Sequence, residues 1–229
     1  PVRPDLGPGF GAVPVGRSAI FSPQFIDWDR QIGYSQMWNF GIQRSIGFNA
    51  IVEISYLGNV GHKIPGPSLS INQVLPENFG PGNRQRFRPF PQYNSVTRVS
   101  PMWGNSSYHG MNVKVEKRFS HGLNFLMNYT WAKFIDDVPA QFEAGEADLG
   151  MQNLYNRAAE KALSGNDVRN RLVWSSVYEI PFGKGRAKLS EGPVAMILGG
   201  WNFGVIMTLQ QGSPYGLSTQ VNSINGFTP

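Results

Sequence analysis

The chain has 229 residues, of which 41% are hydrophobic and 13% aromatic but only 15% charged, whereas an ordinary soluble domain has about 25% charged residues. It contains no cysteine, which excludes disulfides, thiol catalysis and cysteine-ligated metals. No apolar run approaches the roughly 18 residues of a membrane-spanning helix, so a membrane protein with this sequence has to be a β-barrel.

The first half of the chain contains two candidate strands between long loops. Residues 1–33 are rich in proline and glycine and lack a sustained period, so we expect a loop. Alternating side chains predict strands near 34–44 and 48–57, joined by a short turn at Ser45–Gly47. The segment 58–105 holds seven prolines and no convincing strand, and we expect a second long loop there.

The clearest pattern is a hairpin in the middle of the chain. Residues 107–119 and 123–133 alternate between apolar and polar side chains on both sides of a connection at Ser120–Gly122. Each strand is about a dozen residues long, and roughly nine to eleven suffice to cross the hydrocarbon of a bilayer. Strands of soluble proteins are usually about half this length.

The remainder contains two more strands and two more loops. We expect a loop at 134–167 with a short helix near 154–163, strands near 168–180 and 201–211, and a final loop at 212–229. Short and long connections then alternate, which puts every long loop on one side, as in up-and-down membrane barrels. The predicted fold is an all-β antiparallel meander of about six long strands that forms a segment of a larger transmembrane β-barrel.

Alternation gives each strand one apolar and one polar face. The apolar residues are predicted to face lipid: Trp38, Phe40, Ile42, Val52, Ile54, Tyr56, Met111, Val113, Val115, Phe125, Met127, Tyr129, Trp131, Leu172, Trp174, Tyr178, Trp201, Phe203, Val205, Met207 and Leu209. Polar residues of the other face are predicted to line a hydrated lumen: Asn112, Lys114, Glu116, Arg118, Asn124, Asn128, Arg171, Glu179 and Asn202. Six strands cannot enclose such a lumen, because about eight strands already leave an interior that side chains fill, and an open sheet has unpaired edges in lipid.

An antiparallel sheet with one solvated face fits the alternation as well. The alternative is therefore a soluble or surface-attached β-rich binding module of the carbohydrate-directed kind, with aromatic rings that stack on sugars. The two hypotheses differ in where Trp38, Trp131, Trp174 and Trp201 lie. On a barrel they form an outward belt, whereas in a binding module they line a concave cleft or a closed core.

No pattern in the chain indicates an enzyme, a metal site or a cofactor. The three histidines lack metal-ligand spacing, and the acidic residues between Asp136 and Asp148 lack the pattern of a calcium-binding loop. Gly183-x-Gly185 lacks the strand-to-helix context of a phosphate loop. Arg84, Arg86 and Arg88 come without the rest of a nucleic-acid-binding module, so we expect a basic loop and no nucleic-acid partner.

Four stretches carry a family resemblance. They are QMWNFGIQRSIGFNAIVEISYLGNVGHK (36–63), SSYHGMNVKVEKRFSHGLNFLMNYTWAKFIDD (106–137), NDVRNRLVWSSVYEIPFGKGR (166–186) and GGWNFGVIMTLQQGSPYGLS (199–218). In order and spacing the chain resembles the barrel region of TonB-dependent receptor-like outer-membrane proteins, in particular the Oar-like group with a carboxypeptidase-regulatory-like domain.

The resemblance implies the outer membrane of a Gram-negative bacterium and a barrel of about 22 strands plugged by an N-terminal domain. It also implies uptake of a bulky ligand, driven through the TonB complex. The implied partners are outer-membrane lipid, the remainder of the same barrel with its plug domain, and TonB. The plug and the segment that contacts TonB have no counterpart in these stretches, so the segment itself is expected to supply barrel wall and extracellular loops.

Overall fold

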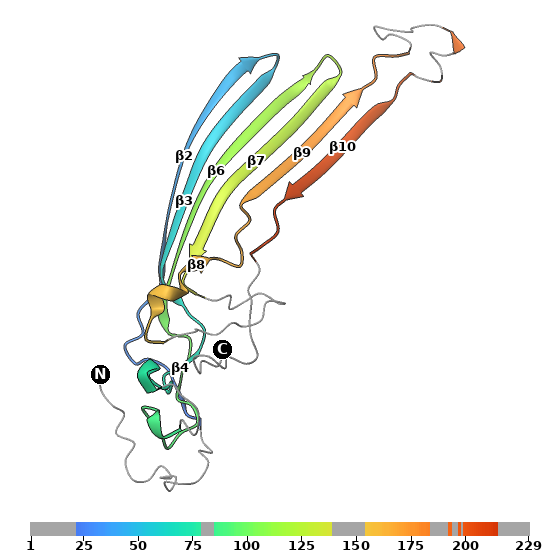
Figure 1. The fold of residues 1–229 in the computed structure, drawn as a ribbon. Helices are drawn as coiled ribbons and strands as arrows, with labels where there is room; N and C mark the ends of the chain where they lie inside the picture. The colour runs from blue at the N-terminus through green and yellow to red at the C-terminus, as the bar shows by residue number, and fades with distance from the viewer. Residues whose placement is uncertain are drawn as a thin grey trace.

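Six long strands form one antiparallel sheet in the order of the chain. The computed structural model describes residues 22–78, 85–138, 154–183, 192–193, 197 and 199–214. The long strands are β2 (Tyr34–Gly47), β3 (Ala50–Pro65), β6 (Met102–Ser120), β7 (Leu123–Asp136), β9 (Asn170–Glu179) and β10 (Asn202–Gln210). Each pairs with the next long strand along the chain, and the short β8 (Ala162–Leu163) pairs with the end of β7 (Figure 1). The predicted all-β antiparallel meander is confirmed.

The two tight hairpin turns require unusual backbone conformations. Phe48 and Asn49 connect β2 to β3 with φ of 51° and 55°, and His121 and Gly122 connect β6 to β7 with φ of 53° and 78°. Positive φ at both central residues is the type I′ geometry, whose twist matches that of the flanking strands. The turn predicted at Ser45–Gly47 is wrong, because a register shift between Ser45 and Gly47 carries β2 further before the chain reverses.

The strands are also longer at the loop end than predicted. β3 continues to Pro65 and β6 begins at Met102, so both ends of the predicted loop 58–105 are strand. Glycines at 58 and 61 and a second register shift after His62 hide the period-two pattern there. β7 likewise reaches Asp136, inside the predicted loop 134–167. In contrast, β9 and β10 lie within their predicted ranges.

The compact part of the molecule lies at one end of the sheet. A small sheet joins β1 (Gln24–Phe25), β5 (Thr97–Arg98) and β4 (Leu69–Ser70), inside segments predicted to be loops. Three short 3-10 helices lie in the same region: η1 (Pro76–Asn78), η2 (Gln85–Phe87) and η3 (Arg157–Glu160), the last within the stretch expected to hold a short helix. Most of the buried residues cluster there: Leu69, Asn72, Val74, Tyr93, Val96, Ser164 and Asp167.

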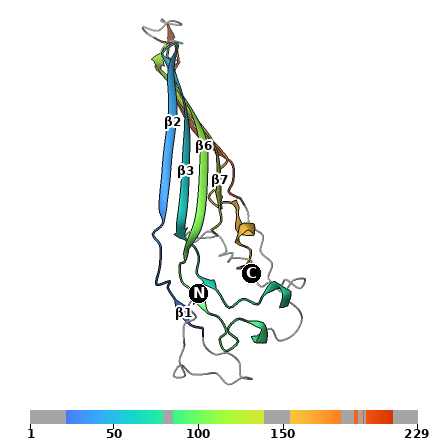
Figure 2. The same ribbon diagram turned by 90° about the vertical axis from the view of Figure 1, so that its left-hand side faces the viewer.

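The long strands themselves are a single bare layer, as Figure 2 shows from the side. Among their hydrophobic residues only Ala50 and Ala132 are buried. Both tight turns and the two ends of the β9–β10 connection (180–201) lie at one end of the sheet, whereas the long β3–β6 and β7–β9 connections lie at the other (Figure 1). We call the latter the loop layer, comprising residues 22–33, 66–78, 85–101 and 154–169. Within the described residues, no helix is long and apolar enough to span a membrane.

Candidate membrane interface and loop layer

The register of the sheet brings the apolar residues of all six strands to one face. Directly paired residues of neighbouring strands share a face, so each row across the sheet can be followed from pair to pair. One complete row contains Ile42, Ile54, Val113, Tyr129, Leu172 and Leu209. A neighbouring row contains Val52, Val115, Met127, Trp174 and Met207. The residues predicted to face lipid therefore lie together on one apolar face, although their contact with lipid stays a prediction.

This apolar face is open. Phe40 is 66% exposed, Ile42 62% and Phe203 58%. Monomeric soluble proteins rarely expose a contiguous apolar face that extends across six strands. A sheet that leaves such side chains uncovered requires an apolar surrounding. Trp38, Trp131 and Trp201 lie on the same face, and Trp131 and Trp201 are 54% and 59% exposed, so the aromatic rings point outward and do not line a closed core.

The apolar run shifts along the strands from one edge of the sheet to the other. On β2 the apolar run is centred on Phe40. The row of paired residues that starts at Phe40 reaches the last strand at Gln211, but the apolar run of β10 is centred on Val205, which is six residues closer to the turns. Spread over the steps from β2 to β10, the shift is about 1.2 residues per strand, which corresponds to a strand tilt of roughly 40° against the apolar band. Strands of outer-membrane barrels tilt by about 35–45°. The band is therefore inclined to the strands as a membrane would be.

Basic residues mark both limits of the band. On the apolar face, Arg44 and Lys117 lie toward the turns, and His109 and Lys133 lie as a direct cross-strand pair toward the loop layer. The Lys117 ammonium donates to Ser120 Oγ at 2.6 Å and to the backbone carbonyls of Ser120 and Leu123 in its own hairpin. Sequence reasoning did not single out Arg44, His109 and Lys133, although the period of two places them on the apolar face, and only the register shows that His109 and Lys133 are a direct pair.

The opposite face carries the residues predicted to line a lumen. Asn112 donates through Nδ2 to Asn128 Oδ1 at 2.6 Å and to Thr130 Oγ1 at 3.1 Å. Lys114 lies 3.3 Å from Glu116, which is also 4.0 Å from Arg118.

The remaining predicted lumen residues share that face by register: Asn124 pairs with Val177, Arg171 with Thr130, and Glu179 with Asn202. Leu126, Val173 and Ile206 lie among them, so this face is mixed and the other is apolar. Lumen contact itself stays a prediction.

The first half of the loop layer folds around one buried amide. Asn72 is fully buried, and its side chain donates to the carbonyls of Phe90 and Tyr93 and accepts from the Phe90 N–H at 2.8 Å. Arg88 donates to the Asn72 carbonyl at 2.8 Å. Gln85 donates to the Tyr93 carbonyl at 2.7 Å. These bonds hold the chain reversal at 85–94 in one conformation, which is unusual for a long connection.

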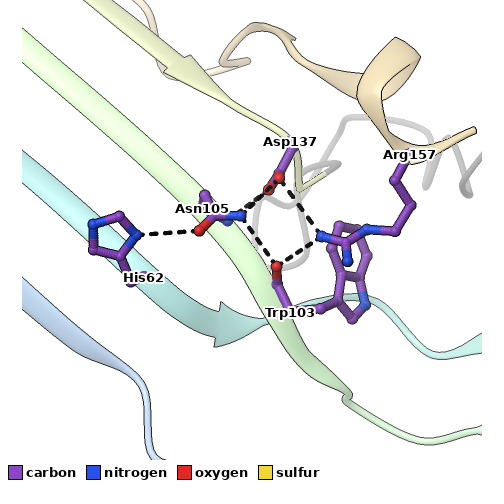
Figure 3. A network of polar contacts seen from close by, with 5 residues as sticks. All are labelled: His62, Trp103, Asn105, Asp137 and Arg157. Atoms are coloured by element: carbon purple, nitrogen blue, oxygen red, sulfur yellow. Dashed lines mark hydrogen bonds and ion pairs between the residues drawn. The ribbon is translucent and has the colours of Figure 1, made fainter.

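A second polar network joins the second long connection to the ends of the strands (Figure 3). Arg157 donates to the Trp103 carbonyl at 2.8 Å, stacks over the Trp103 ring at 4.3 Å and lies 3.7 Å from Asp137. Asp137 accepts from the backbone and side-chain amides of Asn105, whose Oδ1 lies 3.2 Å from His62 Nδ1. The network therefore links β3, β6, the end of β7 and η3.

The second connection also contacts the first directly. Tyr155 donates its hydroxyl to the Gln73 carbonyl at 2.9 Å, and the Leu154 N–H donates to Gln73 Oε1 at 3.1 Å. Partial burial raises the pKa of the Tyr155 phenol, so it stays protonated and able to donate at neutral pH. The two connections thus form one layer.

The structure gives no catalytic grouping among the residues that it describes. His62 lies in the network above, His109 contacts Tyr56, and His121 lies in a turn at the opposite end. No group of three potential metal ligands occurs in the described part of the chain. Most of the acidic stretch Asp136–Asp148 lies outside the described residues, as does the remainder of the Gly183-x-Gly185 motif.

An up-and-down sheet with one open apolar face, a tilted apolar band and long connections at one end defines a wall segment of a membrane β-barrel. A family model described as "Outer membrane beta barrel domain" matches residues 5–229. The chain belongs to this family and lies in the outer membrane. No curated protein and no solved structure matches it.

Proposed function

We propose that the chain supplies barrel wall and extracellular loops to a TonB-dependent outer-membrane receptor that takes up a bulky ligand. One observation carries the proposal: the long connections gather at one end of a tilted sheet and fold into a single layer. A preorganised layer beside a polar barrel face can capture a ligand and pass it into a hydrated interior. Catalysis has no part in this proposal.

The need for more strands supports a large barrel. Within the described residues, β2 and β10 are sheet edges. Unpaired backbone groups cost several kcal/mol each in hydrocarbon, so a barrel wall must close. The charged residues Lys114, Glu116 and Arg118 on the inner face call for a lumen wide enough to hold water. The remainder of the barrel, a plug domain and TonB are the partners that this proposal requires, and the four stretches of family resemblance favour them.

The experiment has two readouts on the intact protein. Single cysteines replace Gln92 or Lys161 in the loop layer, or His121 in a tight turn, and whole cells are treated with a membrane-impermeant maleimide. All three side chains are exposed, and the absence of native cysteine keeps the background low. We expect labelling at the two loop positions and protection at His121→Cys, because outer-membrane barrels keep long loops outside and short turns in the periplasm.

The second readout is binding of the purified intact protein to the periplasmic domain of TonB in detergent. Binding of the TonB domain to this protein, with no binding to an unrelated outer-membrane barrel used as the control, supports the receptor function. A correct labelling pattern without TonB binding would leave a barrel wall but remove the TonB-dependent function. Labelling only at His121→Cys would invert the orientation and remove the loop layer as a ligand-capturing surface.

A further inference from the structure

Four residues make a mixed aromatic and basic cluster on the apolar face, at its boundary with the loop layer. Trp38, Tyr56, His109 and Lys133 come from β2, β3, β6 and β7, and His109 and Lys133 are directly paired. Next to them along the same strands lie the last apolar residues of the band, Met111 and Trp131, which are also a direct pair. We call these four residues the boundary cluster.

The rings of the boundary cluster fix one another. Tyr56 Oη lies 2.7 Å from His109 Nδ1, and the two rings stack with centroids 6.2 Å apart. The Trp38 ring lies 6.3 Å from the His109 ring. It covers Gly58, where any Cβ atom would overlap the indole. The contact with Tyr56 occupies Nδ1 of the imidazole, so Nε2 is the nitrogen left for a further partner.

Lys133 differs from the other lysine of the apolar face. At the opposite boundary, the Lys117 ammonium is satisfied by three oxygens of its own hairpin. The Lys133 side chain is exposed, and no hydrogen bond or ion pair joins its ammonium to another described residue. An ammonium beside the hydrocarbon of a bilayer extends toward the interface and requires an anionic or strongly polar partner there.

We propose that the boundary cluster binds the phosphate group of an anionic membrane lipid. Lys133 supplies the charge and His109 a second polar contact, while Trp38 and Tyr56 lie at the level of the headgroup, where amphipathic rings are favoured. The acyl chains lie along Met111 and Trp131 on the apolar band. This inference rests on the proposed barrel wall, since it requires the apolar face to meet lipid. Charge and position together select a lipid phosphate over free phosphate, because the band supplies binding surface only for acyl chains.

The test measures lipid binding to the intact protein, purified in a non-ionic detergent, by native mass spectrometry. Phosphatidylglycerol and phosphatidylcholine of matched acyl chains are the two probes. The variants are Lys133→Gln, Lys133→Arg and, as a matched loss of charge outside the apolar face, Lys161→Gln. One lysine near an anionic lipid corresponds to about a fivefold change in affinity. We expect Lys133→Gln to weaken phosphatidylglycerol binding about fivefold, and both Lys133→Arg and Lys161→Gln to bind as the wild type does.

Each outcome decides the proposal. The proposal is supported if phosphatidylglycerol binding weakens only in Lys133→Gln and if inorganic phosphate does not compete with the lipid. Equal affinity of the wild type for the two lipids, or equal loss in Lys133→Gln and Lys161→Gln, overturns it. Insertion into phosphatidylcholine vesicles is measured in parallel by protection of the strands from protease. Insertion without lipid preference rejects only the boundary cluster, whereas failure to insert at all rejects the barrel wall as well.

Discussion

At the scale of single residues, adjacent positions of one strand meet different surroundings. Ile54 pairs with Ile42 and Val113 on the apolar face, and its neighbour Ser55 pairs with Gly41 and Asn112 on the polar face. The two side chains share a strand and the same backbone hydrogen-bonding environment. The difference in stability between a charge placed at Ile54 and one placed at Ser55 therefore reports mainly the surroundings of the two faces.

Ile54→Arg should destabilise the barrel by about 2–4 kcal/mol, because it puts a guanidinium near the middle of the apolar band. Ser55→Arg should cost less than about 1 kcal/mol, since its side chain enters the polar face. The measurement is reversible unfolding of the full-length protein in lipid vesicles with denaturant. Equal costs for the two variants would show that the faces are assigned incorrectly.

At the scale of elements, the hairpins depend on turns that few residues tolerate. Gly122 has φ of 78°, and an added Cβ would lie 3.0 Å from the Glu179 carbonyl oxygen of the adjacent strand. The other turn holds Phe48 at φ of 51°, a conformation that costs a bulky residue roughly 1–2 kcal/mol. Both turns therefore keep a residue other than glycine at their first position, Phe48 and His121, and only the second turn has glycine at the next position.

Gly122→Ala should lower the free energy of unfolding by about 1–2 kcal/mol, because alanine is strained at positive φ and crowds β9. Gly204→Ala is the matched control on β10, where an added Cβ meets nothing within 4 Å, and it should be neutral or slightly stabilising. Thermal unfolding of the two variants in the same detergent tests this. If Gly204→Ala lowered the free energy of unfolding as much as Gly122→Ala, the positive φ of the turn would not be the cause of the loss.

At the scale of the whole molecule, one arginine holds the second long connection to strand ends that are far from it in sequence. Arg157 binds the Trp103 carbonyl, covers the Trp103 ring and pairs with Asp137 (Figure 3). The sheet below has its own backbone ladders and does not use this side chain. Loss of Arg157 should therefore free the second connection without weakening the wall.

Arg157→Gln should speed amide hydrogen exchange in residues 154–163 about tenfold, since a hydrogen bond to a charged group contributes about 1.5 kcal/mol. Exchange in β6 and β7 should stay as in the wild type. Arg86→Gln is the control, because Arg86 is exposed and stacks on the adjacent Phe87 within the first connection. Unchanged exchange at 154–163 would mean that Gln73 and Tyr155 hold the connection by themselves.

The sequence by itself determined the number of long strands, their order and the composition of their two faces. These properties depend on local alternation, in which each residue of a strand takes the opposite side from its neighbour. The membership of Val113 and Phe125 in the apolar set, and of Asn112 and Lys114 in the polar set, follows from this period alone. Counting residues likewise separates the two-residue hairpin turns from the long β3–β6 and β7–β9 connections, although the β9–β10 connection (180–201) is also longer than a tight turn.

Only the tertiary structure decided what depends on register and on contacts between distant segments. The pairing of His109 with Lys133, the inclination of the apolar band and the extension of β3 to Pro65 require knowing which residues lie opposite each other across strands. The contacts of Asn72 and Arg157 join segments that no periodic pattern links. A period of two fixes the face on which a side chain lies, but cross-strand hydrogen bonds fix its neighbours, and the boundary cluster and loop layer depend on those neighbours.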